Sequence, residues 1–112
     1  MTKPRQYTCG LDAAIDVIGG KWKALILWAL HAERKRFGEL KRLVPGISEK
    51  MLIQQLRELE SAGCIHREVY REVPPKVEYS LTGLGASLME ALTPLGDWGE
   101  AHMTQIVGAR TT

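Results

Sequence analysis

The sequence predicts a mainly α-helical domain with a small β-hairpin, which is an α+β fold class. Two amphipathic segments are separated by Pro45-Gly46, and two β-rich segments are joined across Pro74-Pro75. Apolar residues at helical spacing fill both ends of the chain. Helices followed by a hairpin in this order form a winged helix-turn-helix. One domain with a single core can account for all 112 residues, 1–112.

The N-terminal part of the chain should contain two helices. Apolar residues recur at helical spacing at Leu11, Ala14, Ile15 and Ile18. They predict a short helix over about residues 9–18 that ends at Gly19-Gly20. Residues 21–32 are apolar on most sides and should form the central core helix, followed by a polar connector at residues 33–36.

A helix-turn-helix is expected over about residues 36–62. Its first helix should begin near Phe37 and carry apolar residues as far as Val44, where Pro45-Gly46 closes it. Ser48 is a good N-cap for the second helix, because its hydroxyl can accept a hydrogen bond from a free amide of the first turn. The inward face and the C-terminal stop of the second helix are Leu52, Leu56, Leu59 and Gly63.

A wing and further helices should complete the chain. The wing is expected over about residues 64–81, with a stiff tip around the two prolines. Its strands are expected at residues 65–71 and 77–81. Thr82 should cap the helices that cover about residues 82–107, and Pro94 should start a new helical segment or kink the first one.

Charge is unevenly distributed along the chain. Residues 1–57 hold 11 Lys and Arg against 5 Asp and Glu, whereas residues 58–112 hold 4 against 8. Because the positive half contains the helix-turn-helix, one face should meet a polyanion. No apolar run approaches the roughly 18 residues of a membrane span. The N-terminus also lacks the apolar core of a signal peptide, so we expect a cytoplasmic protein with no membrane partner.

The polar face of the second helix is the principal candidate site. A helix-turn-helix lays this helix in the DNA major groove, where Arg or Lys pairs with guanine and Gln with adenine. The candidate recognition residues are Ser48, Lys50, Met51, Gln54, Gln55 and Arg57. The alternative is an ordinary solvated helix face, but the preceding turn and the following wing favour DNA contact.

Basic residues beside this helix and on the wing are candidates for contacts with DNA phosphates. Such contacts set the register of a protein on DNA without reading its sequence. The candidates are Arg36, Lys41, Arg42, Arg71 and Lys76. For each of them the alternative is a surface charge that only favours solubility.

Five segments of the sequence resemble the HxlR-type family of bacterial winged-helix transcriptional regulators, which are relatives of the MarR type. They are Ile18-Gly19-Gly20-Lys21-Trp22, Arg36-Phe37-Gly38-Glu39-Leu40, the turn and cap from Pro45 to Leu52, Leu56-Arg57-Glu58-Leu59-Glu60, and the wing from Glu72 to Thr82. The resemblance extends from about Cys9 to His102. It implies a homodimer that binds a pseudo-palindromic operator in double-stranded DNA, most commonly as a repressor.

Cys9 is a candidate redox-sensing residue. It lies at or just before a helix N-terminus near Lys3 and Arg5, where helix amides and positive charge favour the thiolate. Family members typically carry a cysteine here followed by proline, where this chain has Gly10, and several sense oxidants or electrophiles with it. The resemblance therefore implies a small electrophile or oxidant as effector. The alternative for Cys9 is an inert small hydrophobe.

Cys64 is expected in the core, since it precedes a strand. An intramolecular bond between Cys9 and Cys64 stays open, although an intersubunit bond or a small-thiol adduct on Cys9 fits better.

The C-terminal helices are expected to meet a second subunit. Their apolar face from Leu84 to Ile106 exceeds what a small core can cover, so part of it should join the first helix in a dimer interface. The expected interface residues are Leu11, Ile15, Leu88, Leu92, Leu95 and Trp98. Trp22 and Trp28 are expected in the core, as aromatic residues on apolar faces usually are.

Three other functions are less well supported. A protein-interaction module without DNA binding should have an acidic or apolar recognition face, whereas this one carries Lys50 and Arg57 beside a hairpin that we expect to be basic. A thiol enzyme built on Cys9 lacks a nearby His or acid at a suitable spacing, so no catalytic residue is assigned. Cys64 and the histidines match no zinc pattern, and we expect no metal or cofactor.

Overall fold

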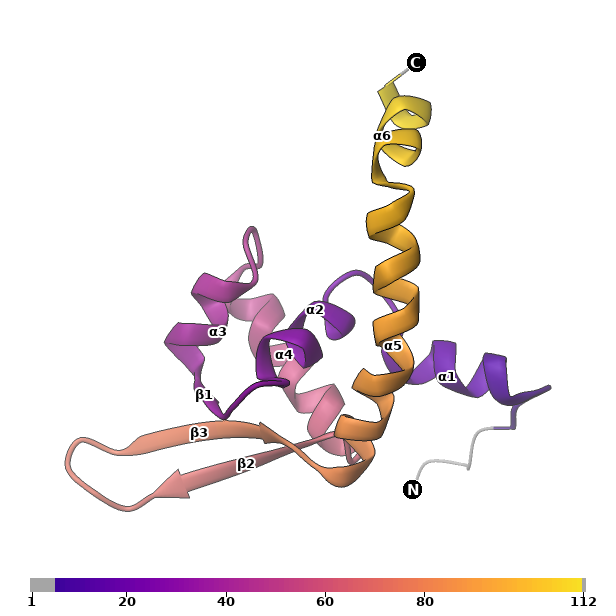
Figure 1. Ribbon diagram of the computed structural model, residues 1–112. Coiled ribbons are helices and arrows are strands. Elements are labelled where there is room, and N and C mark those ends of the chain that lie inside the picture. The colour runs from indigo at the N-terminus through magenta and orange to yellow at the C-terminus, as the bar shows by residue number, and fades with distance from the viewer. Residues whose placement is uncertain (1–5, 112) are drawn as a thin grey trace.

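The structure is a computed structural model that describes residues 6–111 (Figure 1). The described chain forms six helices and three strands. Their order is α1 (Gly10–Ile18), α2 (Lys23–Leu30), β1 (Lys35–Arg36), α3 (Phe37–Leu43), α4 (Glu49–Ser61), β2 (Ile65–Tyr70), β3 (Lys76–Leu81), α5 (Gly83–Ala101) and α6 (Met103–Thr111). We call residues 19–81, from α2 to β3, the body, and α1, α5 and α6 together the arm. The winged helix-turn-helix expected from the sequence is confirmed.

The core lies between α2, α3 and α4. The inward face predicted for α4 is confirmed, because Leu52, Leu56 and Leu59 are buried. They pack with residues of α2, α3 and the following loop, of which the most deeply buried are Ile26, Leu27, Leu40 and Val44. The predicted stop is also confirmed, since Gly63 has φ +80°, a conformation that favours glycine.

Helix α2 contributes Ile26, Leu27 and Leu30 to the core, as predicted, but one side of it stays exposed. Trp28 is 54% exposed and Leu25 is 42% exposed, so the expectation that Trp28 lies in the core is wrong. The helix has only 8 residues, and its neighbours cover the side of Ile26, Leu27 and Leu30. An apolar sequence shows that a helix can be buried, but only the neighbouring elements decide how much of it is.

The sheet has three antiparallel strands in the order β1-β3-β2. Ile65 pairs with Leu81 and Tyr70 with Lys76, which fixes the register of the hairpin. The prediction of a polar connector at residues 33–36 is corrected, because Lys35–Arg36 forms strand β1. This strand pairs with β3 on the side opposite β2. Two charged residues show no strand periodicity, so only their pairing with a distant strand makes them one.

The arm extends away from the body. Figure 1 shows α5 and α6 rising from the end of the hairpin, with α1 beside the base of α5 on the side away from the wing. The new helical segment expected at Pro94 does not form, since α5 runs through Pro94 and the interruption falls at His102. The alternative, a kink of α5 at Pro94, stays a prediction. Pro94 is exposed, so water can solvate the carbonyl that proline leaves without a partner. Among residues 6–111, every helix is too short or too polar to span a lipid bilayer.

A close contact fixes the start of α5 to the body. The Thr82 hydroxyl caps the helix by accepting from the Gly85 amide at 3.1 Å, as predicted, and donates to the Gly63 carbonyl at 2.6 Å. Gly85 is buried, and a Cβ atom there would lie 1.9 Å from the Cys64 carbonyl oxygen. Only glycine therefore fits where α5 crosses the start of β2.

Candidate nucleic-acid interface

Helix α4 is held by its cap and its apolar face so that its polar face is exposed. Ser48 accepts a hydrogen bond from the Met51 amide at 3.1 Å, as predicted. On the side away from the buried leucines, Lys50, Gln54 and Arg57 are all exposed. They line one shallow groove along the helix together with Glu49, Ile53 and Glu58. The structure therefore presents a cation, an amide and a second cation along one face of a rigidly backed helix.

Two of the predicted recognition residues lie at the edge of this face. Met51 is partly buried and packs against the core. The Gln55 amide donates to the Met51 sulfur at 3.4 Å, which holds both side chains beside the helix. Their contact with DNA stays a prediction.

A carboxylate that sequence reasoning missed lies within the candidate face. Glu58 accepts from the Lys23 ammonium at 2.9 Å and from the Gln54 amide at 3.2 Å. The hydrogen bond from Lys23, followed by that from Gln54, holds the pKa of Glu58 below its ordinary value. The spacing of Gln54 and Glu58, one helical turn apart, could have indicated their contact. Lys23 is 35 residues away from Glu58, so that contact needed the fold.

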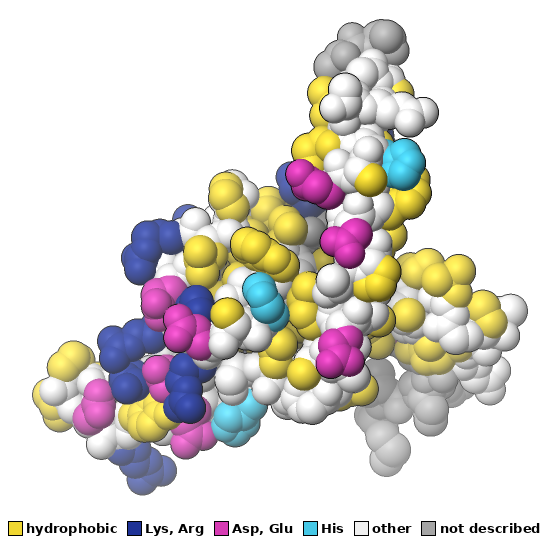
Figure 2. Space-filling model, in the orientation of Figure 1, with side chains coloured by type: hydrophobic (Ala, Val, Ile, Leu, Met, Phe, Trp, Pro, Cys, Tyr) yellow, Lys and Arg dark blue, Asp and Glu magenta, His cyan; other side chains and the backbone are white. Residues whose placement is uncertain are grey.

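The basic residues around α3 are exposed at the edge of the body. Arg36, Lys41 and Arg42 all lie at the surface. Lys41 and Arg42 stand in the last turn of α3, where positive charge also favours the helix dipole. Figure 2 shows Lys and Arg side chains over α3 and the hairpin, with Asp and Glu among them. The same view shows hydrophobic side chains along the arm, with acidic side chains and a histidine among them.

The wing tip contributes two of the predicted phosphate ligands. Arg71 is exposed, and Val73 at the tip is fully exposed. The Lys76 ammonium lies 4.6 Å from the centre of the Tyr70 ring and 4.0 Å from a Glu78 carboxylate oxygen. The charge of Lys76 is therefore partly offset within the wing, whereas Arg71 is exposed to solvent.

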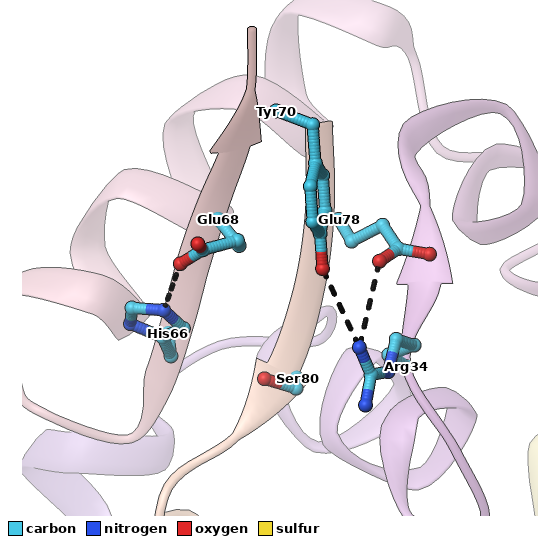
Figure 3. A pocket seen from close by; sticks show the side chains of 6 residues that line it. All are labelled: Arg34, His66, Glu68, Tyr70, Glu78 and Ser80. Carbon is cyan, nitrogen blue, oxygen red and sulfur yellow. Dashed lines mark hydrogen bonds and ion pairs between the residues drawn. The ribbon is translucent and has the colours of Figure 1, made fainter. Parts of the chain in front are cut away.

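The outer face of the sheet is electrically balanced, which corrects the expectation of a basic hairpin. Arg34 lies 3.7 Å from Glu78 and donates to the Tyr70 hydroxyl at 3.4 Å, while His66 and Glu68 are 2.8 Å apart (Figure 3). These side chains line a small polar pocket with Ser80. The neighbouring Glu78 carboxylate raises the pKa of Tyr70. Net positive charge thus lies around α3, where Arg36, Lys41 and Arg42 outnumber Glu39, and not across the sheet. Helix α4 carries its two cations together with the carboxylates of Glu49, Glu58 and Glu60.

The two cysteines differ in environment. Cys9 is exposed at the N-cap position of α1, and its thiol makes no capping hydrogen bond. Lys3 and Arg5, which were expected to favour its thiolate, lie outside the described residues. Cys64 is buried as predicted, and burial raises the pKa of its thiol, so the neutral form is favoured. Both thiols are free in this structure.

The six residues expected at a dimer interface fall into two groups. Leu88 and Leu92 are partly buried and pack against the core of their own chain. The other four are exposed by more than half: Leu11, Ile15, Leu95 and Trp98. The exposed group is the better candidate for contact with another surface. Among residues 6–111, no three His, Cys, Asp or Glu side chains lie together as metal ligands would.

The fold and the capped polar helix define a winged helix-turn-helix protein. The sequence matches the HxlR-like helix-turn-helix family over residues 17–107, so the chain belongs to that family, as the resemblance implied. It is 50% identical to the uncharacterized HTH-type transcriptional regulator YdeP of Bacillus subtilis strain 168 over 98 residues, which is 88% of this chain and 77% of YdeP.

Two solved structures are similar over most of their length. The redox regulator HypR in its reduced form superposes with a TM-score of 0.84 and 44% identity, covering 89% of this chain and 99% of HypR. Diamide-treated YodB from B. subtilis superposes with a TM-score of 0.71 and 34% identity, covering 86% of this chain and 96% of YodB. The family is thus one of transcriptional regulators, not of enzymes.

Proposed function

We propose that the protein is a sequence-specific DNA-binding repressor that uses α4 as its recognition helix. The observation that carries this proposal is the Ser48-capped helix, whose outer face presents Lys50, Gln54 and Arg57 over a rigid apolar back. Arginine and lysine pair with guanine and glutamine with adenine in the major groove. Arg71 and Lys76 on the wing, with Arg36, Lys41 and Arg42 beside α3, would bind phosphates and set the register.

The proposed regulator acts as a homodimer. Leu11, Ile15, Leu95 and Trp98 expose large apolar surfaces on the arm. A second copy can cover them through a two-fold interface. Two recognition helices would then bind half-sites roughly 34 Å apart, which is one turn of DNA. The operator is therefore expected to be an inverted repeat.

Thiol modification of Cys9 is the proposed control. Cys9 is exposed, and it begins the helix that carries Leu11 and Ile15. An oxidant or electrophile that modifies this thiol would change the dimer contacts, alter the spacing of the recognition helices and release DNA. The similarity to HypR and YodB, which were solved in reduced and diamide-treated states respectively, supports this proposal.

A selection of genomic fragments bound by the purified protein tests the proposed function. It would be run under reducing conditions and again after mild treatment with diamide or a quinone. We expect one inverted-repeat motif that is lost on oxidation. Cys9→Ser should retain the motif in both conditions, whereas Cys64→Ser should behave like the wild type.

The other outcomes of the selection are equally informative. A motif that survives oxidation in the wild-type protein would reject control through Cys9 and retain the DNA-binding function. The absence of any motif in both conditions would reject the DNA-binding function and favour a protein-interaction module.

A further inference from the structure

Three side chains are hydrogen-bonded in a row across α2 and the polar face of α4. The Lys23 ammonium donates to Glu58 Oε1 at 2.9 Å, and the Gln54 amide nitrogen donates to Glu58 Oε2 at 3.2 Å. Side chains of a helix lean toward its N-terminus, so Glu58 reaches back over the turn that carries Gln54. One carboxylate therefore joins a lysine of the body to a candidate base-reading residue.

The ion pair at the base of this row is strongly favoured by its surroundings. Only 11% of the Lys23 side chain is exposed, so its charge needs a partner. Lys23 begins α2, where the helix dipole disfavours a cation, and Glu58 lies in the last turn of α4, where the dipole disfavours an anion. Each charge thus offsets an unfavourable field on the other, which holds the Glu58 carboxylate in place.

This carboxylate determines how the Gln54 amide is presented. A glutamine amide has two N–H donors and one carbonyl acceptor. With one N–H bonded to Glu58, the other N–H and the carbonyl oxygen remain for a base. Adenine requires that pair, because its major-groove edge offers an acceptor at N7 and a donor at N6. A free amide could rotate by half a turn and exchange its donor and acceptor ends.

We propose that Glu58 is a specificity-determining positioning residue that fixes the orientation of the Gln54 amide and thereby selects adenine on one strand of each half-site. Lys23 supports this role by holding the carboxylate. The inference rests on the proposed DNA-binding function, and it adds to the recognition face a residue that need not itself touch a base.

The test is a selection from randomised DNA duplexes, read as base preference at every position. The wild-type protein is compared with Gln54→Ala, Glu58→Ala and the double variant. Glu60→Ala is the matched control, because it removes another exposed carboxylate from α4 while the Gln54 amide keeps its bond to Glu58. Any general gain in affinity from removing negative charge near DNA should appear equally in Glu58→Ala and Glu60→Ala.

We expect Gln54→Ala to lower the preference for adenine at one step of each half-site by about tenfold. Glu58→Ala should lower the preference at that same step by about threefold or more, and the double variant should lose no more than Gln54→Ala alone. Glu60→Ala should keep the wild-type preference at every step. A purely structural role of Glu58 would instead weaken binding to all sequences alike.

A second variant guards against loss of the fold, since Glu58→Ala leaves the Lys23 charge without its partner. Lys23→Met combined with Glu58→Met removes both charges and should shift the base preference as Glu58→Ala does. An unchanged preference in this folded double variant would overturn the inference, as would an unchanged preference in Gln54→Ala. Failure of the proposed function differs from both outcomes, because the wild-type protein would then select no motif.

Discussion

The body and the arm bury their apolar side chains to very different extents. Within residues 6–111, every fully buried hydrophobic side chain lies in the body, between Ile26 and Ile65. The arm instead leaves Leu11, Leu95 and Trp98 more than half exposed. Leu88 and Leu92 of the arm pack against the core that the body forms, whereas the exposed apolar side chains of the arm would be covered only by another surface. Under the proposed dimer, folding and assembly would depend largely on separate parts of the chain.

The largest effect is expected from a substitution at Gly85, where the arm contacts the body. Gly85→Ala places a Cβ atom that would lie 1.9 Å from the Cys64 carbonyl oxygen, so the backbone must shift. We expect it to lower the free energy of unfolding by about 3 kcal/mol or more, measured by urea denaturation. Gly83→Ala in the same helix is the control, because a Cβ atom at Gly83 would point into open space. Equal stability of the two variants would contradict the close contact.

A charge on the arm should affect assembly and spare the body. Leu95 is 60% exposed, so Leu95→Glu should leave the helical circular dichroism unchanged. It should weaken the proposed dimer by about thirtyfold or more, which corresponds to about 2 kcal/mol, measured by sedimentation. Glu90→Gln is the control on an exposed polar position of α5. A dimer of wild-type affinity in Leu95→Glu would remove this part of the arm from the interface.

Leu88→Ala tests whether α5 has one side for the core and another for the proposed dimer, because Leu88 packs against the core of its own chain. It should lower the stability of the fold where Leu95→Glu does not.

Basic residues of the body and of the arm should differ in their effect on DNA binding. Lys76→Ala should weaken binding to all sequences and reduce the log–log salt slope by about one unit, measured in binding titrations at several salt concentrations. Because the Lys76 ammonium lies near Glu78, its loss should cost less affinity than Arg71→Ala. Arg110→Ala on the arm should leave the slope unchanged. An unchanged slope in Lys76→Ala would reject phosphate contact by that residue.

The smallest predicted effect is on the pH dependence of the body. Hydrogen bonds from Lys23 and Gln54 lower the pKa of Glu58 in the folded protein. The ionised carboxylate therefore stabilises the folded protein, and this contribution is complete at pH values above the pKa of the unfolded carboxyl group, about 4.3. It is lost as the pH falls through the lower pKa that the group has in the folded protein. Glu58→Gln should therefore be less stable than the wild type near neutral pH and approach it below about pH 4.

Urea denaturation between neutral and acidic pH measures this difference. Glu60→Gln is the control, and its curve should stay parallel to that of the wild type. A constant difference between Glu58→Gln and the wild type at every pH would show that the charge of Glu58 does not contribute.

Local sequence was sufficient for most helices and for the hairpin. Ser48 and Thr82 cap the helices that follow them, as predicted, because each capping bond spans only three residues. The leucine spacing of α4 identified its buried face and hence the candidate recognition face opposite. Such features depend only on residues within one or two helical turns, so they can be predicted from the sequence alone.

Features that depend on distant residues could be read only from the folded chain. Lys35 and Arg36 become a strand only through their pairing with β3. Trp28 is 54% exposed because the elements within residues 6–111 cover its side of α2 only in part, and Glu58 is paired with Lys23, which is 35 residues away. Local sequence thus specifies most of the helices, their caps and which face of α4 is polar. Packing between distant elements sets which apolar faces are covered and which charges are paired, since burial and pairing depend on side chains that only the fold brings together.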